Sequence, residues 1–254
     1  MIRVACSNSP VLRGWRGILN GQNMVDADGG LWCRRDGRCS VMREDMAYAV
    51  ELVRQDQQNT STWNGGTTTE IAIYPKNTIY SRRDFVWRIS SANVEAEESE
   101  FTSLPGIWRL IMVLEGDMTL DHEHHHSVRL QPFQQDAFAG DWATRSTGMA
   151  RDFNIMLSGA CSGQMQAVSV QGQSSLAIPD VTVQTCDKGK KTVYVVYGVD
   201  GTIVASVGTD ETWRINTGDA LLLTTDHQGA TRSVRLFNQD NVPVHVLLAT
   251  IWYE

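Results

Sequence analysis

Four of the six histidines in this 254-residue chain lie within five positions, in the stretch DHEHHH. His122, His124 and His126 alternate, so on a continuous strand their imidazoles would share one face and could hold zinc, nickel or iron. The stretch lies between two short apolar segments, however, where a hairpin turn is expected, and the side chains of an exposed turn diverge. We therefore predict a solvated histidine-rich turn with no metal site and no cofactor, and keep these three histidines as the alternative metal ligands.

A second set of reactive side chains falls on strand faces that should be buried. Alternation places Arg88 with Ser90 on one such face, Asp152 with Asn154 on another, and Arg109 among apolar neighbours on a third. Burial of these groups is costly unless they pair with one another or with a ligand. Guanidinium groups bind carboxylates through paired hydrogen bonds, so the pattern predicts a pocket for a small anion. The alternative is an internal network of ion pairs, or side chains that face outward.

The stretch WNGGTTTE, residues 63–70, is the third candidate. Gly65 and Gly66 permit a tight turn and a close approach of the backbone, and three threonine hydroxyls follow them. It is not a phosphate-binding loop, because it lacks G-K-[ST] and a following helix. Either a ligand-contacting loop or a plain turn into an edge strand fits these residues. No nucleophile motif or nucleotide fingerprint occurs, so no catalytic residue is predicted.

Short strands must position these side chains. Apolar alternation or short apolar runs, broken by Gly, Pro, Asp and Gln, recur along the chain, and no amphipathic helix exceeds two turns. Strands at this spacing indicate a sandwich or barrel. The clearest are FVWRISSANV (85–94), in which Phe85, Trp87 and Ile89 share a face, RLIMVLEG (109–116), SVRLQP (127–132), DAFAG (136–140) and RDFNIML (151–157).

An internal repeat divides the chain. The segment RLIMVLEGDMTL…VRLQPFQQDAFAGD resembles TVYVVYGVDGTI…WRINTGDALLLTTD, with Gly116 matching Gly198 and Asp136 matching Asp219. Two copies of one β unit predict two similar halves, which we place at 46–168, with the ligand site, and at 169–254. Residues 1–45 have no sustained apolar period, and we predict a poorly structured extension. Met46 is an alternative start.

Composition narrows the class of protein. A net charge of -7 argues against nucleic-acid binding, and no apolar run approaches the ~18 residues of a membrane helix. The first residues lack the apolar core of a signal peptide. Five irregularly spaced cysteines favour reduced thiols, so we expect a cytoplasmic protein.

Three stretches resemble the HutD/Ves family: WNGGTTTEIAIYP, FVWRISSANVEAEESEFTSLPGIWRLIMVLEG and FAGDWATRSTGMARDFNIML. The resemblance runs from about residue 46 to the C-terminus. It implies an all-β fold of two cupin-type β-barrels, a bicupin, with few short helices and no required metal. In the cupin frame Gly116 is similar to the last glycine of the first motif, Arg109 stands where that motif has its glutamate, and Asn154 resembles the terminal asparagine of the second.

The resemblance also implies a part in histidine utilisation, in which a non-catalytic regulator binds N-formylglutamate or a related intermediate. We therefore expect a small anionic metabolite as the partner, with no nucleic acid and no membrane, and allow for a homodimer. The alternatives are a metal-dependent cupin enzyme acting on a small acid, and a structural protein with an internal salt-bridge network. Compared with the commoner family pattern, the chain lacks a basic residue after Trp63 and is two residues shorter before Glu70. The ligand-binding residues implied are Trp63, Gly65, Gly66, Thr67, Thr68, Glu70, Arg88, Ser90, Arg109, Asp152 and Asn154.

Overall fold

The chain forms two compact units, Met1–Ala47 and Tyr48–Glu254. The structure, a computed structural model, describes residues 48–178, 191–208, 211–225 and 234–254, together with four short strands between residues 18 and 41.

The first unit contains a small antiparallel sheet. Its strands follow one another in space as they do in the sequence: β1 (Ile18–Asn20), β2 (Asn23–Val25), β3 (Leu31–Cys33) and β4 (Cys39–Val41). The remainder of the predicted extension, with the alternative start Met46, lies outside the described residues.

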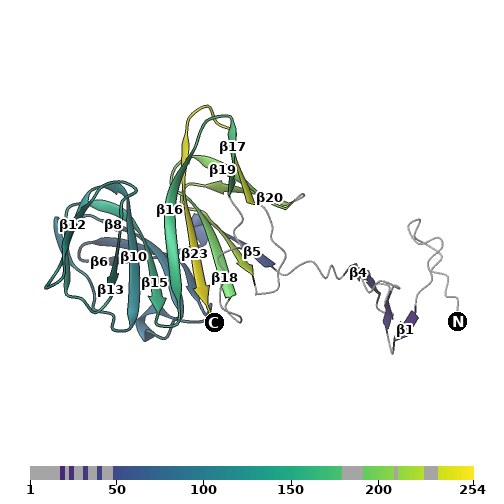
Figure 1. The fold of residues 1–254 in the computed structure, drawn as a ribbon, viewed down its shortest axis with the longest axis horizontal. Helices are drawn as coiled ribbons and strands as arrows, with labels where there is room; N and C mark the ends of the chain where they lie inside the picture. The colour runs from purple at the N-terminus through teal and green to yellow at the C-terminus, as the bar shows by residue number, and fades with distance from the viewer. Residues whose placement is uncertain are drawn as a thin grey trace. The chain divides into compact units, whose positions relative to one another are not determined.

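Two antiparallel sheets make up the first half of the larger unit (Figure 1). Their strands are β6 (Asn59–Trp63), β7 (Gly66–Tyr74), β8 (Trp87–Val94), β9 (Glu98–Glu100), β10 (Ile107–Gly116), β11 (Met118–His122), β12 (Ser127–Leu130), β13 (Gln135–Ala139), β14 (Thr144–Thr147) and β15 (Ala150–Ser158). The six-stranded sheet has the order β13-β10-β15-β8-β7-β6, and the four-stranded sheet has the order β12-β11-β14-β9.

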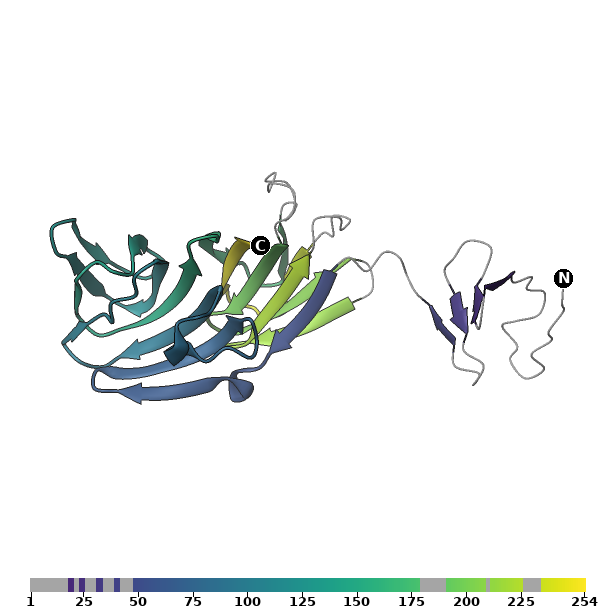
Figure 2. The same cartoon turned by 90° about the horizontal axis from the view of Figure 1, so that it is seen from below.

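The second half repeats this arrangement with a five-stranded and a four-stranded sheet. Its strands are β5 (Tyr48–Val53), β16 (Ser162–Val170), β17 (Ser174–Ile178), β18 (Lys191–Gly198), β19 (Thr202–Val207), β20 (Glu211–Asn216), β21 (Ala220–Thr225), β22 (Val234–Asn238) and β23 (Val244–Tyr253). The sheet orders are β16-β23-β18-β21-β5 and β17-β22-β19-β20. Figure 2 shows β5, drawn in blue, beside the green strands of this half.

Strand pairing agrees with the internal repeat. In the first half β10 lies between β13 and β15, and in the second half β18 lies between β21 and β23. The first strand of the larger unit, β5, and the strand that follows β15, β16, both pair within the second half. The boundary at residue 168 stays a prediction.

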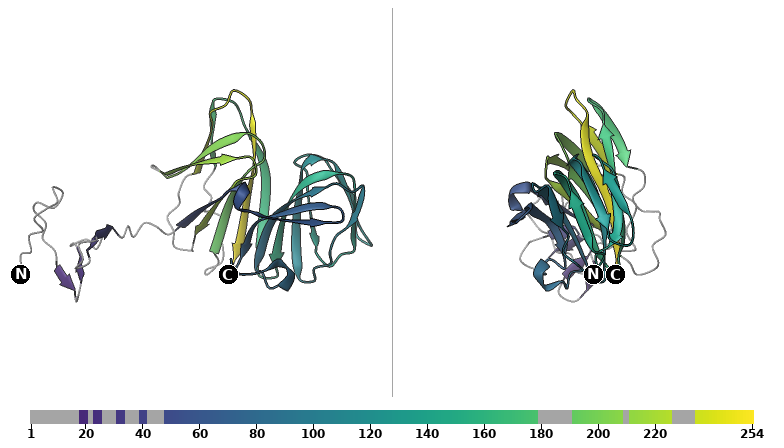
Figure 3. Two further views of the ribbon diagram at one scale, coloured as in Figure 1. Left: turned by 180° about the vertical axis from the view of Figure 1, so that it is seen from behind. Right: turned by 90° about the vertical axis from the view of Figure 1, so that its left-hand side faces the viewer.

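The two halves pack through the larger sheet of each (Figure 3). Side chains on one face of β8, Trp87 and Ile89, contribute to a core shared with Val195, Tyr197 and other residues of the second half. Each such fully buried side chain contributes roughly 1.5–3 kcal/mol to folding. Because strand residues alternate, the next side chains along β8 point into the interior of the first half.

The helical elements are short. Two 3-10 helices, η1 (Gln55–Gln57) and η2 (Tyr80–Arg82), occur in the part of the chain that the structure describes. Among those same residues, no helix is long and apolar enough to cross a membrane.

Candidate functional site

The polar residues predicted to share buried faces do come together inside the first half. Arg88 on β8 and Arg109 on β10 are both in register with Met156 of the intervening strand β15. One step along, Ser90 is in register with Asn154. The inner cluster consists of these side chains with two carboxyl groups, and apart from Glu70 its members are buried: Glu70, Arg88, Ser90, Arg109, Asp152 and Asn154.

Arg88 is held by polar contacts on its own side of the cluster. Its Nε donates to Glu70 Oε2 at 2.7 Å, and its Nη1 donates to Ser90 Oγ at 3.0 Å. The guanidinium carbon also lies 4.2 Å from the ring centroid of Tyr80 in η2. The Glu70 carboxylate therefore balances the charge of Arg88.

Arg109 has no comparable partner. Its guanidinium carbon lies 4.6 Å and 5.3 Å from the ring centroids of Phe101 and Phe138. Within the described part of the chain, Arg109 makes no hydrogen bond or ion pair, and its buried Nε is unsatisfied. Desolvation lowers the pKa of Arg109 to about 10, although Tyr80 and Asp152 act in the opposite direction.

Asp152 and Asn154 complete this unsatisfied side of the cluster. Asp152 Oδ1 and Asn154 Oδ1 are buried and have no hydrogen-bond partner. Desolvation raises the pKa of Asp152 to about 7, while Arg109 and the backbone N–H of Ala92 partly offset that rise. The Asp152 carboxyl group therefore changes its protonation state near neutral pH. Three unpaired buried polar atoms on adjacent strands indicate a site for a polar ligand or water.

The sequence resemblance leads us to expect Arg109 in the place of a cupin glutamate. A guanidinium group is always protonated near neutral pH and offers no lone pair to a metal ion. The inner cluster therefore suits an anion rather than a metal.

The threonine-rich stretch forms the turn and second strand of the β6–β7 hairpin. Gly66 has φ +146, and a Cβ there would collide with the carbonyl oxygen of Asn93, so the position requires glycine. The carbonyl of Gly65 accepts from Glu95 N at 2.8 Å, and Trp63 packs against the core of the first half. These three residues shape the hairpin, which joins the edge strand β6 to β7.

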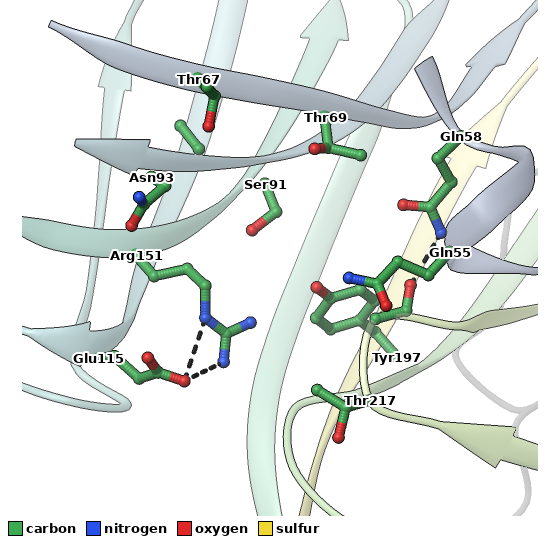
Figure 4. A pocket seen from close by; sticks show the side chains of 12 residues that line it. Gln55, Gln58, Thr67, Thr69, Ser91, Asn93, Glu115, Arg151, Tyr197 and Thr217 are labelled. Atoms are coloured by element: carbon green, nitrogen blue, oxygen red, sulfur yellow. Dashed lines mark hydrogen bonds and ion pairs between the residues drawn. The ribbon is translucent and has the colours of Figure 1, made fainter. Parts of the chain in front are cut away.

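The threonines divide between the two faces of β7. Thr68 is in register with Ala92 of β8, and Ala92 is in register with Asp152 of β15. Thr67 lines a different depression. That depression, which we call the inter-half cleft, has a volume of about 240 Å³ and receives residues from both halves (Figure 4). Its walls are Gln55, Gln58, Thr67, Thr69, Ser91, Ala92, Asn93, Glu115, Arg151, Tyr197, Thr217 and Gly218.

Arg151 supplies the cation of the inter-half cleft. Its Nε donates to Glu115 Oε1 at 3.2 Å, and its Nη2 donates to the carbonyl of Val199 at 3.2 Å. Burial raises the pKa of Tyr197 on the opposite wall. Sequence reasoning missed this cleft, because only the packing of the two halves brings residues so distant in sequence together.

The histidine-rich turn is partly different from the expectation. The side chain of His124 is 88% exposed, and its Nε2 lies 3.4 Å from Oε1 of the neighbouring Glu123. His122, the last residue of β11, is buried, and its Nε2 lies 2.9 Å from Asp136 Oδ2. His126 Nε2 lies 3.1 Å from the same oxygen. The prediction that these side chains diverge is therefore wrong for His122 and His126. Burial lowers the pKa of His122, although Asp136 opposes this.

Comparisons with solved structures show what the fold resembles. A conserved protein of unknown function from Pseudomonas aeruginosa matches at 22% identity and TM-score 0.64, over 80% of this chain and 98% of that one. HutD from Pseudomonas fluorescens, in a formate condition, matches at 22% identity and TM-score 0.55, over 79% and 98%. A formate complex of oxalate decarboxylase from Lactobacillus farciminis matches at 7% identity and TM-score 0.55, over 78% and 85%.

These similarities concern the fold, and they agree with the strand arrangement. The prediction of an all-β fold of the bicupin class is confirmed, since nearly all regular structure is strand and similar structures include cupin proteins such as oxalate decarboxylase. A model of the family described as HutD matches residues 55–238, and the chain therefore belongs to the HutD family.

Proposed function

We propose that this HutD-family protein binds a small carboxylate at the inner cluster and acts in the cytoplasm as a non-catalytic regulator. One observation carries the proposal: Arg109 Nε, Asp152 Oδ1 and Asn154 Oδ1 are buried together without hydrogen-bond partners. Leaving such groups unpaired costs about 1–3 kcal/mol each, and more for charged ones. A carboxylate ligand recovers part of that free energy by accepting from Arg109 Nε and from a protonated Asp152, and a ligand that also carries an N–H can donate to Asn154 Oδ1.

The balance of charge in the inner cluster favours an anion. Glu70 neutralises Arg88 through the 2.7 Å contact at Nε. When the pH lies below the Asp152 pKa of about 7, this carboxyl group holds its proton, and no carboxylate in the cluster balances Arg109. One carboxylate ligand then restores neutrality, accepts from the guanidinium group, and accepts from the protonated Asp152.

Two structures with a similar fold guide the choice of the first ligand to test. Two of the similar structures involve formate: HutD from Pseudomonas fluorescens, in a formate condition, and the formate complex of the oxalate decarboxylase from Lactobacillus farciminis. The rings of Tyr80, Phe101 and Phe138 lie against the two guanidinium groups of the inner cluster. N-formylglutamate, which carries a formyl group and two carboxylates, is therefore the first ligand to test, together with other acids of histidine breakdown.

The test is isothermal titration of the full chain with formate, acetate, glutamate and N-formylglutamate near pH 6. We expect one of these acids to bind, the matching neutral amide to fail, and Arg109→Gln to weaken binding at least about tenfold. Arg151→Gln, in the inter-half cleft, is the matched control and should retain binding. If Arg151→Gln abolishes binding and Arg109→Gln does not, the ligand occupies the cleft and the proposed site is wrong. If none of the acids binds the wild type, the proposed function is wrong.

A further inference from the structure

Three side chains at one end of the first half form a cluster that carboxylate binding does not use. His122 ends β11, His126 lies in the following turn, and Asp136 is the second residue of β13. The two Nε2 atoms lie 2.9 Å and 3.1 Å from Asp136 Oδ2. One ligating atom of each residue lies within 4.8 Å of the others.

A hydrogen bond on the far side of His122 orients its ring. Nδ1 lies 2.8 Å from Thr144 Oγ1, and this hydroxyl donates its single hydrogen to the carbonyl of Trp142 at 3.2 Å. In the tautomer with its hydrogen on Nδ1, His122 donates to this hydroxyl, and its Nε2 lone pair is directed at the Asp136 carboxylate. Two acceptors at that distance are stable only with a proton or a cation between them. Metal-bound histidines use this outer hydrogen bond to fix the ring.

The surroundings make one side rigid and leave the other open. The ring centroid of His122 lies 4.5 Å from that of Phe138 and 5.6 Å from that of Trp142, and the side chain is fully buried. The side chain of His126 is 41% exposed. His125 stacks on Trp142 with 3.7 Å between ring centroids, which holds the turn in place. A cation can therefore enter from the His126 side and keep a water molecule there.

We propose that His122, His126 and Asp136 bind one zinc ion through two imidazole nitrogens and one carboxylate oxygen. This donor set is typical of zinc sites with an open fourth position, and bonds of ~2.0–2.1 Å separate tetrahedral donor atoms by roughly 3.3 Å. The separations between the nitrogens and the carboxylate oxygen need to widen only slightly to reach that value. His124 takes no part.

The ion would join the two sheets of the first half. Asp136 belongs to the edge strand of the six-stranded sheet, and His122 belongs to the four-stranded sheet. The corresponding aspartate of the second half, Asp219, is satisfied without a metal, because it pairs with Arg54 at 2.7 Å and accepts from the backbone of Gln55 and Asn216. Among the residues that the structure describes, the second half therefore offers no matching site at Asp219.

The test uses the full chain without a histidine tag, stripped with a chelator and titrated with zinc against a chromophoric chelator. We expect one zinc per chain at this site and a higher Tm with zinc. His126→Ala and Asp136→Asn should each weaken binding at least about tenfold, whereas the matched control His124→Ala should change it by no more than about twofold. His126 lies on the surface, so its variant should fold, which circular dichroism will confirm.

Cobalt substitution separates this site from the cysteines of the chain. Cobalt at His122, His126 and Asp136 should give d–d absorption without thiolate charge-transfer bands, and His126→Ala should remove that absorption. The proposal is overturned if wild type and His126→Ala bind zinc equally, if His124→Ala is the damaging variant, or if the only cobalt signal is a thiolate band.

Discussion

Arg88 and Arg109 lie on the two strands that flank β15, each in register with Met156, so both guanidinium groups point into the same interior. They are not equivalent, because Arg88 is paired with Glu70 whereas Arg109 has no polar partner in the described part of the chain. Arg88 also contributes to the lowering of the Arg109 pKa. The first two predictions follow from this asymmetry.

Arg109→Met should stabilise the ligand-free protein while removing carboxylate binding. The substitution takes away a desolvated cation without breaking a hydrogen bond, and methionine fills similar space between Phe101 and Phe138. Replacement of buried charges by apolar side chains is often neutral or stabilising by about 1–4 kcal/mol. Urea denaturation measures the change. Arg129→Met, which removes an exposed partner of Asp117, is the control. A marked loss of stability in Arg109→Met would show that the guanidinium group is structurally paired.

Glu70→Gln should destabilise the protein by about 3 kcal/mol, because it leaves Arg88 buried beside a neutral partner. Glu51→Gln is the matched control, since its 2.7 Å pair with Lys76 is exposed on both sides and should be worth less than about 1 kcal/mol. Free energies of unfolding from chemical denaturation compare the two. Equal, small effects would mean that water screens Arg88 despite its burial.

Stability should depend on pH through Asp152. Its pKa is about 7 in the folded protein, against an ordinary value of 3.8 that we take for the unfolded chain, so the folded protein binds more protons between these values. The free energy of unfolding therefore falls as pH rises from about 4 to about 7, by roughly 1.4 kcal/mol for each unit of pKa difference. Asp152→Asn mimics the protonated form, so it should match the wild type near pH 4 and exceed its stability above pH 7. Parallel stability curves for the two proteins would contradict a raised pKa.

Gly66→Ala should cost more than about 2 kcal/mol, because φ at this position is +146 and a Cβ would meet the carbonyl of Asn93. Gly159→Ala is the control, since a Cβ there meets nothing within 4 Å, and it should shift stability by less than about 0.5 kcal/mol. Thermal unfolding of both variants is the measurement. A Gly66→Ala protein as stable as Gly159→Ala would show that the hairpin can relax.

Alternation predicted the inner cluster because it depends on a period of two, which short strands keep well. Arg88, Ser90, Arg109, Asp152 and Asn154 all lie within uninterrupted strands, and all five are buried as expected. The prediction is wrong at Phe85, which packs with Met156 rather than beside Trp87, because β8 begins only at Trp87. Val86, between the two residues, forms a bend, and a period of two does not survive such a bend.

The sequence alone did not predict which distant segments come into contact. The approach of Asp136 to His122 and His126 depends on how two sheets meet, and periodicity within one strand does not contain that information. The inter-half cleft is a similar case, since Arg151 and Tyr197 come from different halves. The fold class could be predicted from the sequence, because turn residues and apolar runs indicate short strands. The internal repeat indicates two similar halves.

The pairing of β5 with β21 has a consequence for biosynthesis. The ribosome releases β5 before any strand of the first half, yet its partner β21 emerges only near the end of translation. The edge of β5 therefore stays unpaired while the first half completes its sheets. During that interval β5 can pair with the wrong strand or with another chain. Cutting the gene between the halves would separate β5 from its partner, so the C-terminal fragment would lack one strand of its five-stranded sheet and the N-terminal fragment would carry β5 without β21.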